Sequence, residues 1–157
     1  MTTSNVLGWR EWVSFPDLGL PLIKAKVDTG ARTSCLHAFM VETFERDGNL
    51  WVKFAIHPDQ NSNAEALRCE APLKDRRAVR DSGGHQEMRY VIETTVSVGK
   101  KLHLAEITLT DRDAMKFRAL LGRTMLRGIY TVDPGKSYLQ GRKKRLKKSQ
   151  ATASDTE

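Results

Sequence analysis

The spacing of the apolar residues constrains the fold of this chain most, because they recur mostly at every second position. The pattern is clearest at Ile23, Ala25 and Val27, which alternate with Lys24 and Lys26. This period is typical of strands that bury one face, since successive side chains of a strand point to opposite sides of the sheet. The sequence therefore predicts an all-β, or mainly β, fold.

A turn signal in the first half of the chain predicts a hairpin over residues 40–56. Apolar and polar residues alternate on either side of Asp47 and Gly48, two residue types that tolerate the positive φ angles of a tight turn. Residues 57–75 are instead polar and irregular. We expect a loop there, with at most one short strand near residues 66–69.

A second hairpin is predicted further along the chain, where residues 79–81 and 88–96 have strand-like patterns. The residues between these strands form a flexible tip: Ser82, Gly83, Gly84 and His85. Residues 102–109 predict the next strand.

The last apolar segment predicts a different local structure. Residues 119–122 form a short buried run, and residues 123–127 are helix formers followed by Gly128, which is suited to end one or two helical turns. Residues 129–132 return to a strand pattern. We therefore expect one short helix near the C-terminal end of the fold.

Length and charge predict one domain with tails. A chain of 157 residues can bury one core, and we assign residues 8–140 to the domain and residues 1–7 to an N-terminal tail. Much of the formal charge of +7 lies in residues 141–157, which we expect to be a basic, disordered tail. A tail of this kind is usually solvated. Its alternative role is contact with RNA or the ribosome, and nucleic acid would bind only through it.

The sequence contains no apolar run approaching the roughly 20 residues that span a bilayer. Its first residues also lack the pattern of a secretory signal. We therefore expect a cytoplasmic protein without membrane contact, with Cys35 and Cys69 as free thiols.

Asp28, Thr29, Gly30 and Ala31 lie where an apolar strand leaves the core. A carboxylate at such a strand end is held rigidly yet can face a cleft, and a glycine lets the backbone turn and other groups approach. Taken alone, these four residues are equally consistent with a strand that ends in an ordinary turn.

A second motif follows much later in the chain, at Leu120, Leu121, Gly122 and Arg123. Together the two motifs resemble the retropepsins, in which an apolar strand ends in Asp-Thr/Ser-Gly-Ala and a later apolar-apolar-Gly precedes a short helix. The resemblance is closer to a bacterial retropepsin-like family whose members are often named ATP-dependent zinc proteases. It extends over residues 25–38, 89–92, 121–124 and 132–134, and covers roughly residues 8–140.

This resemblance implies a closed acid-protease barrel and a catalytic pair of carboxylates that share a proton, without a cofactor. The chain has one such aspartate, Asp28, so the pair implies a homodimer. The resemblance also implies that Thr29 braces the two loops and that Gly30 places its backbone beside the carboxylates. Leu120, Leu121 and Gly122 would support the site from behind.

The resemblance assigns the flap that closes over a substrate to Ser82, Gly83, Gly84 and His85. Two glycines suit a mobile lid, although any exposed hairpin can carry them. The predicted hairpin at residues 46–49 departs from simple retropepsins, which lack it in that position.

Three residues beside the two motifs are candidates for binding substrate: Ala31, Arg32 and Arg123. Arginines that line a cleft favour acidic substrates, although Arg123 alone is better explained by a structural ion pair near the aspartate loop. The resembled family is associated with ATP-grasp ligases that add glutamates to a ribosomal protein. This implies a peptide or protein substrate with an acidic tail, and a ligase or ribosomal protein as partner.

A metal site has little support, because the four histidines are scattered and only Cys35 and His37 lie close together in sequence. No phosphate-binding Gly-x-x-x-x-Gly-Lys-Ser/Thr loop is present, so ATP dependence would belong to a partner. Two rival functions remain. One is a basic β-barrel module that binds RNA or a ribosomal protein, and the other, ranked last, is a metallopeptidase.

Overall fold

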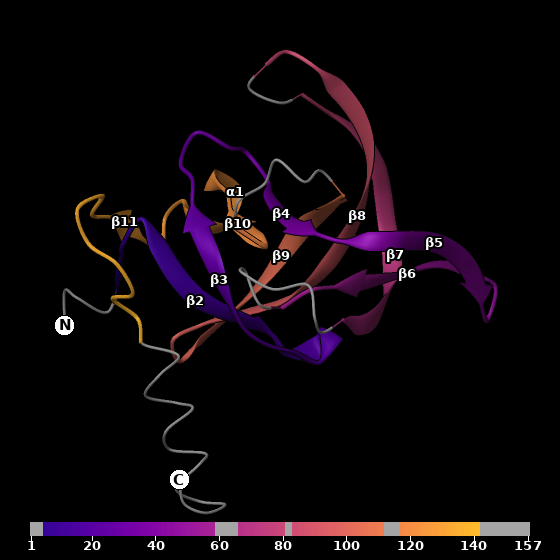
Figure 1. The fold of residues 1–157 in the computed structure, drawn as a ribbon, viewed down its shortest axis with the longest axis horizontal. Coiled ribbons are helices and arrows are strands. Elements are labelled where there is room, and N and C mark those ends of the chain that lie inside the picture. Colours follow the sequence, from indigo (N-terminus) through magenta and orange to yellow (C-terminus); the bar gives the residue numbers. More distant parts are fainter. Residues whose placement is uncertain (1–4, 59–65, 81–82, 112–116, 142–157) are drawn as a thin grey trace, which may run out of the picture.

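The computed structural model describes residues 5–58, 66–80, 83–111 and 117–141, and in these residues the fold is mainly β (Figure 1). The N-terminal half contains β1 (Val6–Leu7), β2 (Arg10–Phe15), a 3-10 turn (Pro16–Leu18), β3 (Leu20–Val27), β4 (Ser34–His37), β5 (Phe39–Arg46) and β6 (Asn49–Ile56). The C-terminal half contains β7 (Leu67–Arg80), β8 (Gln86–Val98), β9 (Lys101–Thr110), β10 (Ala119–Leu121), the helix α1 (Arg123–Leu126) and β11 (Thr131–Val132). The predicted fold class is confirmed.

A closed barrel is the centre of the fold. Among the described residues, six strands form it in the order β2-β3-β10-β4-β9-β8, and pairing of β2 with β8 closes the ring. The alternating residues of the sequence fill its interior, since Val13, Ile23, Ala25 and Ile107 have at most 1% of their surface exposed. Burial of these side chains drives barrel formation.

Two hairpins extend from the barrel (Figure 1). The β5–β6 hairpin projects sideways, and its turn residues Asp47 and Gly48 have φ angles of 53° and 81°, as the sequence predicted. The β7–β8 ribbon curls over the side of the barrel that carries β4, β10 and α1. A register shift between Leu73 and Asp75 interrupts its ladder, and such irregularities bend strands.

The predicted loop over residues 57–75 is wrong in its second half, because β7 begins at Leu67 and runs for 14 residues. Its first part pairs with β6 and its second part pairs with β8. Backbone hydrogen bonds to these two strands therefore stabilise β7, although its charged side chains do not show a strand pattern. Pro72 lies within it, opposite Trp51.

The two ends of the fold lie together. β1 pairs in parallel with β11, and Leu7 is fully buried, so the packed part includes two residues that we assigned to the N-terminal tail. Glu11 adds a second connection. Its carboxylate has no exposed surface and accepts hydrogen bonds from the backbone N–H groups of Gly8, Leu139 and Gln140 at 2.6, 2.9 and 3.0 Å.

Some predictions concern residues that the structure does not describe, and one strand is shorter than predicted. Asp81 and Ser82 lie outside, as does the basic tail except for Gly141. The expected strand at residues 129–132 is shorter, since β11 contains Thr131 and Val132 alone. No helix in the described residues has the length and apolar character needed to cross a membrane.

Candidate active site

The aspartate loop begins where β3 ends, directly after the buried Val27. The backbone N–H of Asp28 donates to the carbonyl oxygen of Leu121 at 2.9 Å, which fixes the start of the loop to β10. The Asp28 carboxylate accepts the N–H of Gly30 through Oδ1 at 2.9 Å. Asp28 is half-buried, and Thr29 and Gly30 are exposed. The loop therefore presents a positioned carboxylate at the surface of this chain.

β10 supports the loop by lying between β3 and β4. It runs parallel to β3, with Ala119 opposite Ala25, and antiparallel to β4, with Ala119 opposite Leu36. Gly122 follows β10, and its N–H donates to the hydroxyl of the buried Ser34 at 3.0 Å. Thus the second motif packs behind the first, as the resemblance implied.

The first turn of α1 completes this support. The N–H groups of Arg123 and Thr124 donate to the carbonyl oxygens of Ala31 and Arg32 at 2.8 and 3.0 Å. The Arg123 side chain donates to the Thr29 carbonyl oxygen at 3.0 Å. Arg123 is therefore held by a backbone oxygen instead of the acidic partner that we considered for it.

A cleft of about 1180 Å³ opens over the aspartate loop. The loop and α1 line one side and the β7–β8 hairpin the other, with β4 and β9 between them. Eight of the predicted site residues line it: Asp28, Gly30, Ala31, Arg32, Gly83, His85, Leu120 and Arg123. Thr29, Gly84, Leu121 and Gly122 are near but not among the lining residues, and Ser82 lies outside the described residues.

The lining of the cleft is strongly basic. Its arginines are Arg32, Arg77, Arg80, Arg89 and Arg123. The acidic residues in the lining are Asp28 and Glu106. Sequence reasoning did not single out Arg77, Arg80 and Arg89 as site residues, because the pairing and curvature of β7 and β8 place these side chains at the cleft. Their signal was the repeated arginine on both sides of the predicted hairpin tip.

The cleft arginines differ in their partners. Arg77 is bound by two carboxylates, with Nε 2.8 Å from Asp75 and Nη1 2.9 Å from Glu106. These pairs hold the pKa values of both carboxyl groups below their usual range. Arg32 and Arg80 are exposed and have no side-chain partner within the described part of the chain.

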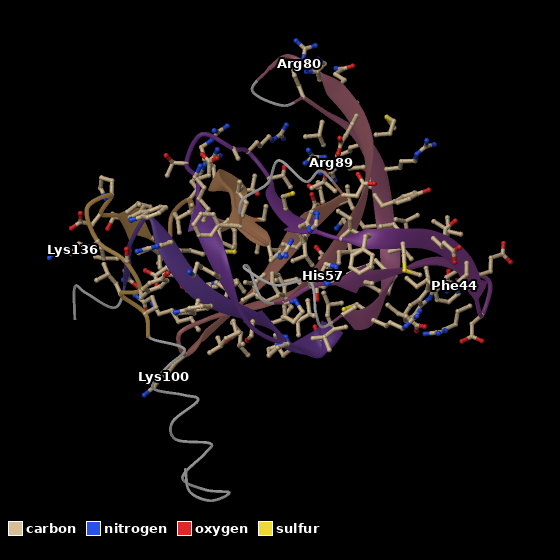
Figure 2. All side chains as sticks on the ribbon, in the orientation of Figure 1. Phe44, His57, Arg80, Arg89, Lys100 and Lys136 are labelled. Carbon is tan, nitrogen blue, oxygen red and sulfur yellow. The ribbon has the colours of Figure 1, made fainter. Side chains whose placement is uncertain are left out.

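Arg89 lies deeper, on the concave side of the β7–β8 ribbon (Figure 2). Its Nε donates to Glu87 Oε2 at 2.7 Å, and its Nη1 lies 3.7 Å from Cys35 Sγ and 3.4 Å from Thr108 Oγ1. Burial raises the pKa of the Cys35 thiol, and the nearby Arg89 only partly opposes this shift. The thiol therefore stays protonated and uncharged at neutral pH.

No group of three His, Cys, Asp or Glu side chains that could hold a metal occurs within the described residues. His37 instead lies 3.4 Å from Arg118 Nη1 through its Nδ1.

Comparison with known proteins gives the family. A family model described as "Retropepsin-like aspartic endopeptidase RimB" matches residues 6–143. The chain belongs to this RimB-like family. The fold is also similar to the crystal structure of a Legionella pneumophila protein with unknown function. The match has a TM-score of 0.72 and 23% sequence identity, and it covers 87% of this chain and 98% of that one. At that identity the match shows the fold alone.

Curated relatives carry a different name. Proteins named "Probable alpha-L-glutamate ligase" from Shewanella pealeana and Desulfotalea psychrophila are each 46% identical to this RimB-like chain, over 138 and 130 residues. The matches cover 88% and 83% of this chain but only 30% and 28% of those proteins. The ligase name therefore describes proteins in which a RimB-like segment is the smaller part.

Proposed function

We propose that this chain is an aspartic peptidase that acts as a homodimer, with Asp28 of each copy forming the catalytic pair. The observation that carries this proposal is the Asp28 loop, held by β10 and Gly122 at the edge of a cleft, in a chain of the retropepsin-like family. The exposure of Thr29 and Gly30 supports a second copy at this position, because residues that brace a dimer are uncovered in a single chain.

The need for a second copy follows from the acids of the cleft. An aspartic peptidase requires two carboxylates that share one proton. Glu106 is the other acid in the lining, but it is bound by Arg77 at 2.9 Å and Lys74 at 3.5 Å, which favour its fully ionised form. Asp28 has no cation partner in the described residues. A second Asp28 related by a two-fold axis would supply the missing carboxylate.

In this mechanism the ionised carboxylate removes a proton from water, and the water oxygen attacks the carbonyl carbon of the scissile peptide. The protonated carboxyl hydrogen-bonds to the carbonyl oxygen and transfers its proton as the tetrahedral intermediate forms. The amide nitrogen then takes a proton from the pair as the C–N bond breaks. No covalent enzyme intermediate is formed, and no metal is needed.

The charge of the cleft supports an acidic substrate. Five arginines and two acids line it, and one of those acids is already paired. Such a lining attracts carboxylates and repels cations. The glutamate ligase name of the longer relatives agrees with this, since a protein that adds glutamate would make the kind of chain that this cleft would bind. We propose the trimming of glutamate tails, with a ligase or its ribosomal substrate as partner.

The test compares the wild-type chain with Asp28→Asn on an oligoglutamate-tailed peptide and on an untailed control peptide, with and without a chelator. Asp17→Asn is the matched control, because Asp17 is exposed in the Pro16–Leu18 turn and does not line the cleft. With chelator present, we expect mass spectrometry to detect equal cleavage of the tailed peptide by wild type and by Asp17→Asn. We expect no cleavage by Asp28→Asn. Cleavage that persists in Asp28→Asn would refute the aspartic mechanism, and cleavage lost with the chelator would indicate a metallopeptidase.

A further inference from the structure

We propose that Arg89 forms the subsite that binds one acidic side chain of the substrate and makes the enzyme prefer a carboxylate over its amide. This assignment rests on the proposed peptidase function and adds to it the residue that selects the substrate.

The first argument is the hydrogen-bonding capacity that remains on Arg89. A guanidinium has five N–H donors, and two parallel bonds to one carboxylate are its strongest arrangement. In Arg89 one carboxylate, Glu87, occupies Nε, whereas the contacts of Nη1 are long and made to a thiol and a hydroxyl. Within the described residues, the outer nitrogens therefore have no anionic partner. Arg77, which has the same side chain on the neighbouring strand, is instead bound by two carboxylates, through Nε and Nη1.

The second argument is burial. The Arg89 side chain is 11% exposed, compared with 36% for Arg77. A charge that is removed from water interacts more strongly with an opposite charge and is screened less by salt. Arg89 lines the cleft, so a substrate carboxylate can reach it. A buried, unsaturated cation discriminates between a carboxylate and a neutral amide better than the exposed Arg32 and Arg80 can.

The third argument is the rigidity of the surroundings. Glu87 accepts hydrogen bonds from both Arg89 Nε and Thr110 Oγ1, at 2.7 and 2.8 Å, and this orients the guanidinium. Thr108 donates to the carbonyl oxygen of Ser34 at 3.3 Å. Ser34 in turn binds the N–H of Gly122 behind the aspartate loop. Ser34 and Gly122 therefore connect the subsite to the segment that holds the catalytic loop, and a side chain held by Arg89 would keep a fixed position relative to Asp28.

Arg32 and Arg80 take a different role. They are exposed on the aspartate loop and at the outer end of the β7–β8 hairpin (Figure 2). Charges at such positions attract an acidic chain over a distance but lose much of this effect as the ionic strength rises. Salt dependence thus separates the exposed arginines from Arg89.

The experiment first maps the bond that wild type cleaves in an oligoglutamate peptide, and then replaces each glutamate near that bond by glutamine, one at a time. The ratio of kcat/KM for the glutamate and glutamine peptides is measured at low and high salt. We expect one position with a ratio of about ten- to hundred-fold, the range for a hydrogen-bonded buried charge, and we expect it to persist at high salt.

Arg89→Met should reduce the ratio at this position to about one while cleavage of the glutamine peptide continues. Arg46→Met is the matched control, because Arg46 pairs with Glu70 and does not line the cleft, and it should keep the wild-type ratio. A purely structural role of Arg89 would lower cleavage of both peptides equally and leave the ratio unchanged, which would overturn the assignment. Arg89→Lys, which keeps the charge but not the paired donors, should retain part of the preference.

Binding separates this proposal from the peptidase function. The affinities of Asp28→Asn and of the double variant Asp28→Asn/Arg89→Met for the uncleaved peptides are measured by fluorescence anisotropy. A preference for glutamate that disappears in the double variant supports the subsite even if wild type cleaves nothing, an outcome that would refute the peptidase function alone. Equal preference in the two variants would overturn the subsite.

Discussion

Replacement of Gly122 by alanine should both destabilise the fold and inactivate the site, because the space for a Cβ is already filled by backbone. A Cβ at this position would lie 2.6 Å from the carbonyl carbon of Thr33, 2.8 Å from its oxygen and 3.0 Å from the oxygen of Ala31. Backbone atoms cannot rotate away as a side chain can. The end of β10 must therefore move away from the aspartate loop.

This movement strains two hydrogen bonds, from Gly122 N–H to Ser34 and from Arg123 N–H to Ala31. Each contributes about 0.5–1.5 kcal/mol, and overpacking adds about 1–3 kcal/mol. The lower entropy of the unfolded alanine chain offsets about 0.4–1 kcal/mol. The expected net loss in the free energy of unfolding is about 2–4 kcal/mol, so the variant should still fold. Displacement of Asp28 should lower kcat/KM by about a hundred-fold or more.

Urea unfolding followed by circular dichroism measures the stability, and peptide cleavage measures the activity. Gly135→Ala is the matched control, because its Cβ would meet only Asp133 Oδ1 within 4 Å, at 3.6 Å. This control should be unchanged or stabilised by up to about 1 kcal/mol, with full activity. If the free energies of unfolding of Gly122→Ala and Gly135→Ala differ by less than about 0.5 kcal/mol, the close packing at Gly122 does not stabilise the fold, and the reasoning is refuted.

Two further predictions concern groups outside the cleft. Glu11→Gln should lower the free energy of unfolding in urea by about 3 kcal/mol, because the amide must turn its NH₂ toward at least one of the three N–H groups that now donate to Glu11. Glu42→Gln is the control. The Glu42 side chain is 68% exposed, so this variant should lose less than about 0.5 kcal/mol. His103 Nε2 and the Tyr130 hydroxyl lie 2.7 Å apart; burial, together with Lys101, lowers the pKa of His103 from 6.5, and burial raises the pKa of Tyr130 from 10.0. Both shifts favour the neutral forms, so their contribution to stability should be complete between pH 6.5 and 10 and lost as pH falls through the folded pKa of His103 or rises through that of Tyr130. Unfolding free energies measured as the pH is raised above 10 should show a smaller loss in Tyr130→Phe than in wild type, and an identical loss would contradict the assignment.

Local pattern allowed the strand end at Asp28 and the short buried run before Gly122 to be predicted, whereas the packing of one behind the other was implied by the resemblance to retropepsins. The alternation that ends at Val27 places Asp28 at a strand end, and Gly122 follows a short buried run. β7 could not be predicted in the same way. Its second part has charged residues at most positions, and its strand conformation comes from pairing with β8, which only the folded chain provides.

The roles of the cleft arginines also depend on the folded chain. Arg77 and Arg89 lie opposite each other in the β7–β8 ladder. One is neutralised because Glu106 of β9 and Asp75 reach it, and the other is left with a single carboxylate. Each arginine has an acid two residues before it, and the additional partner of Arg77, Glu106, comes from another strand, so no local pattern separates the two residues. Ser34 was missed for the same reason, because its hydrogen bond with the N–H of Gly122 forms only in the folded chain and leaves no signal in the sequence.

The insertion of β10 between β3 and β4 has a consequence for the biosynthesis of the protein. A ribosome makes Asp28 well before β10, the strand that holds its loop, because β10 follows β9 in the chain. Until then β3 and β4 lack the neighbour that joins them. A nascent chain thus carries Asp28 long before it carries the strand that holds the Asp28 loop, and under the proposed function an incomplete product that stops before Ala119 would be inactive.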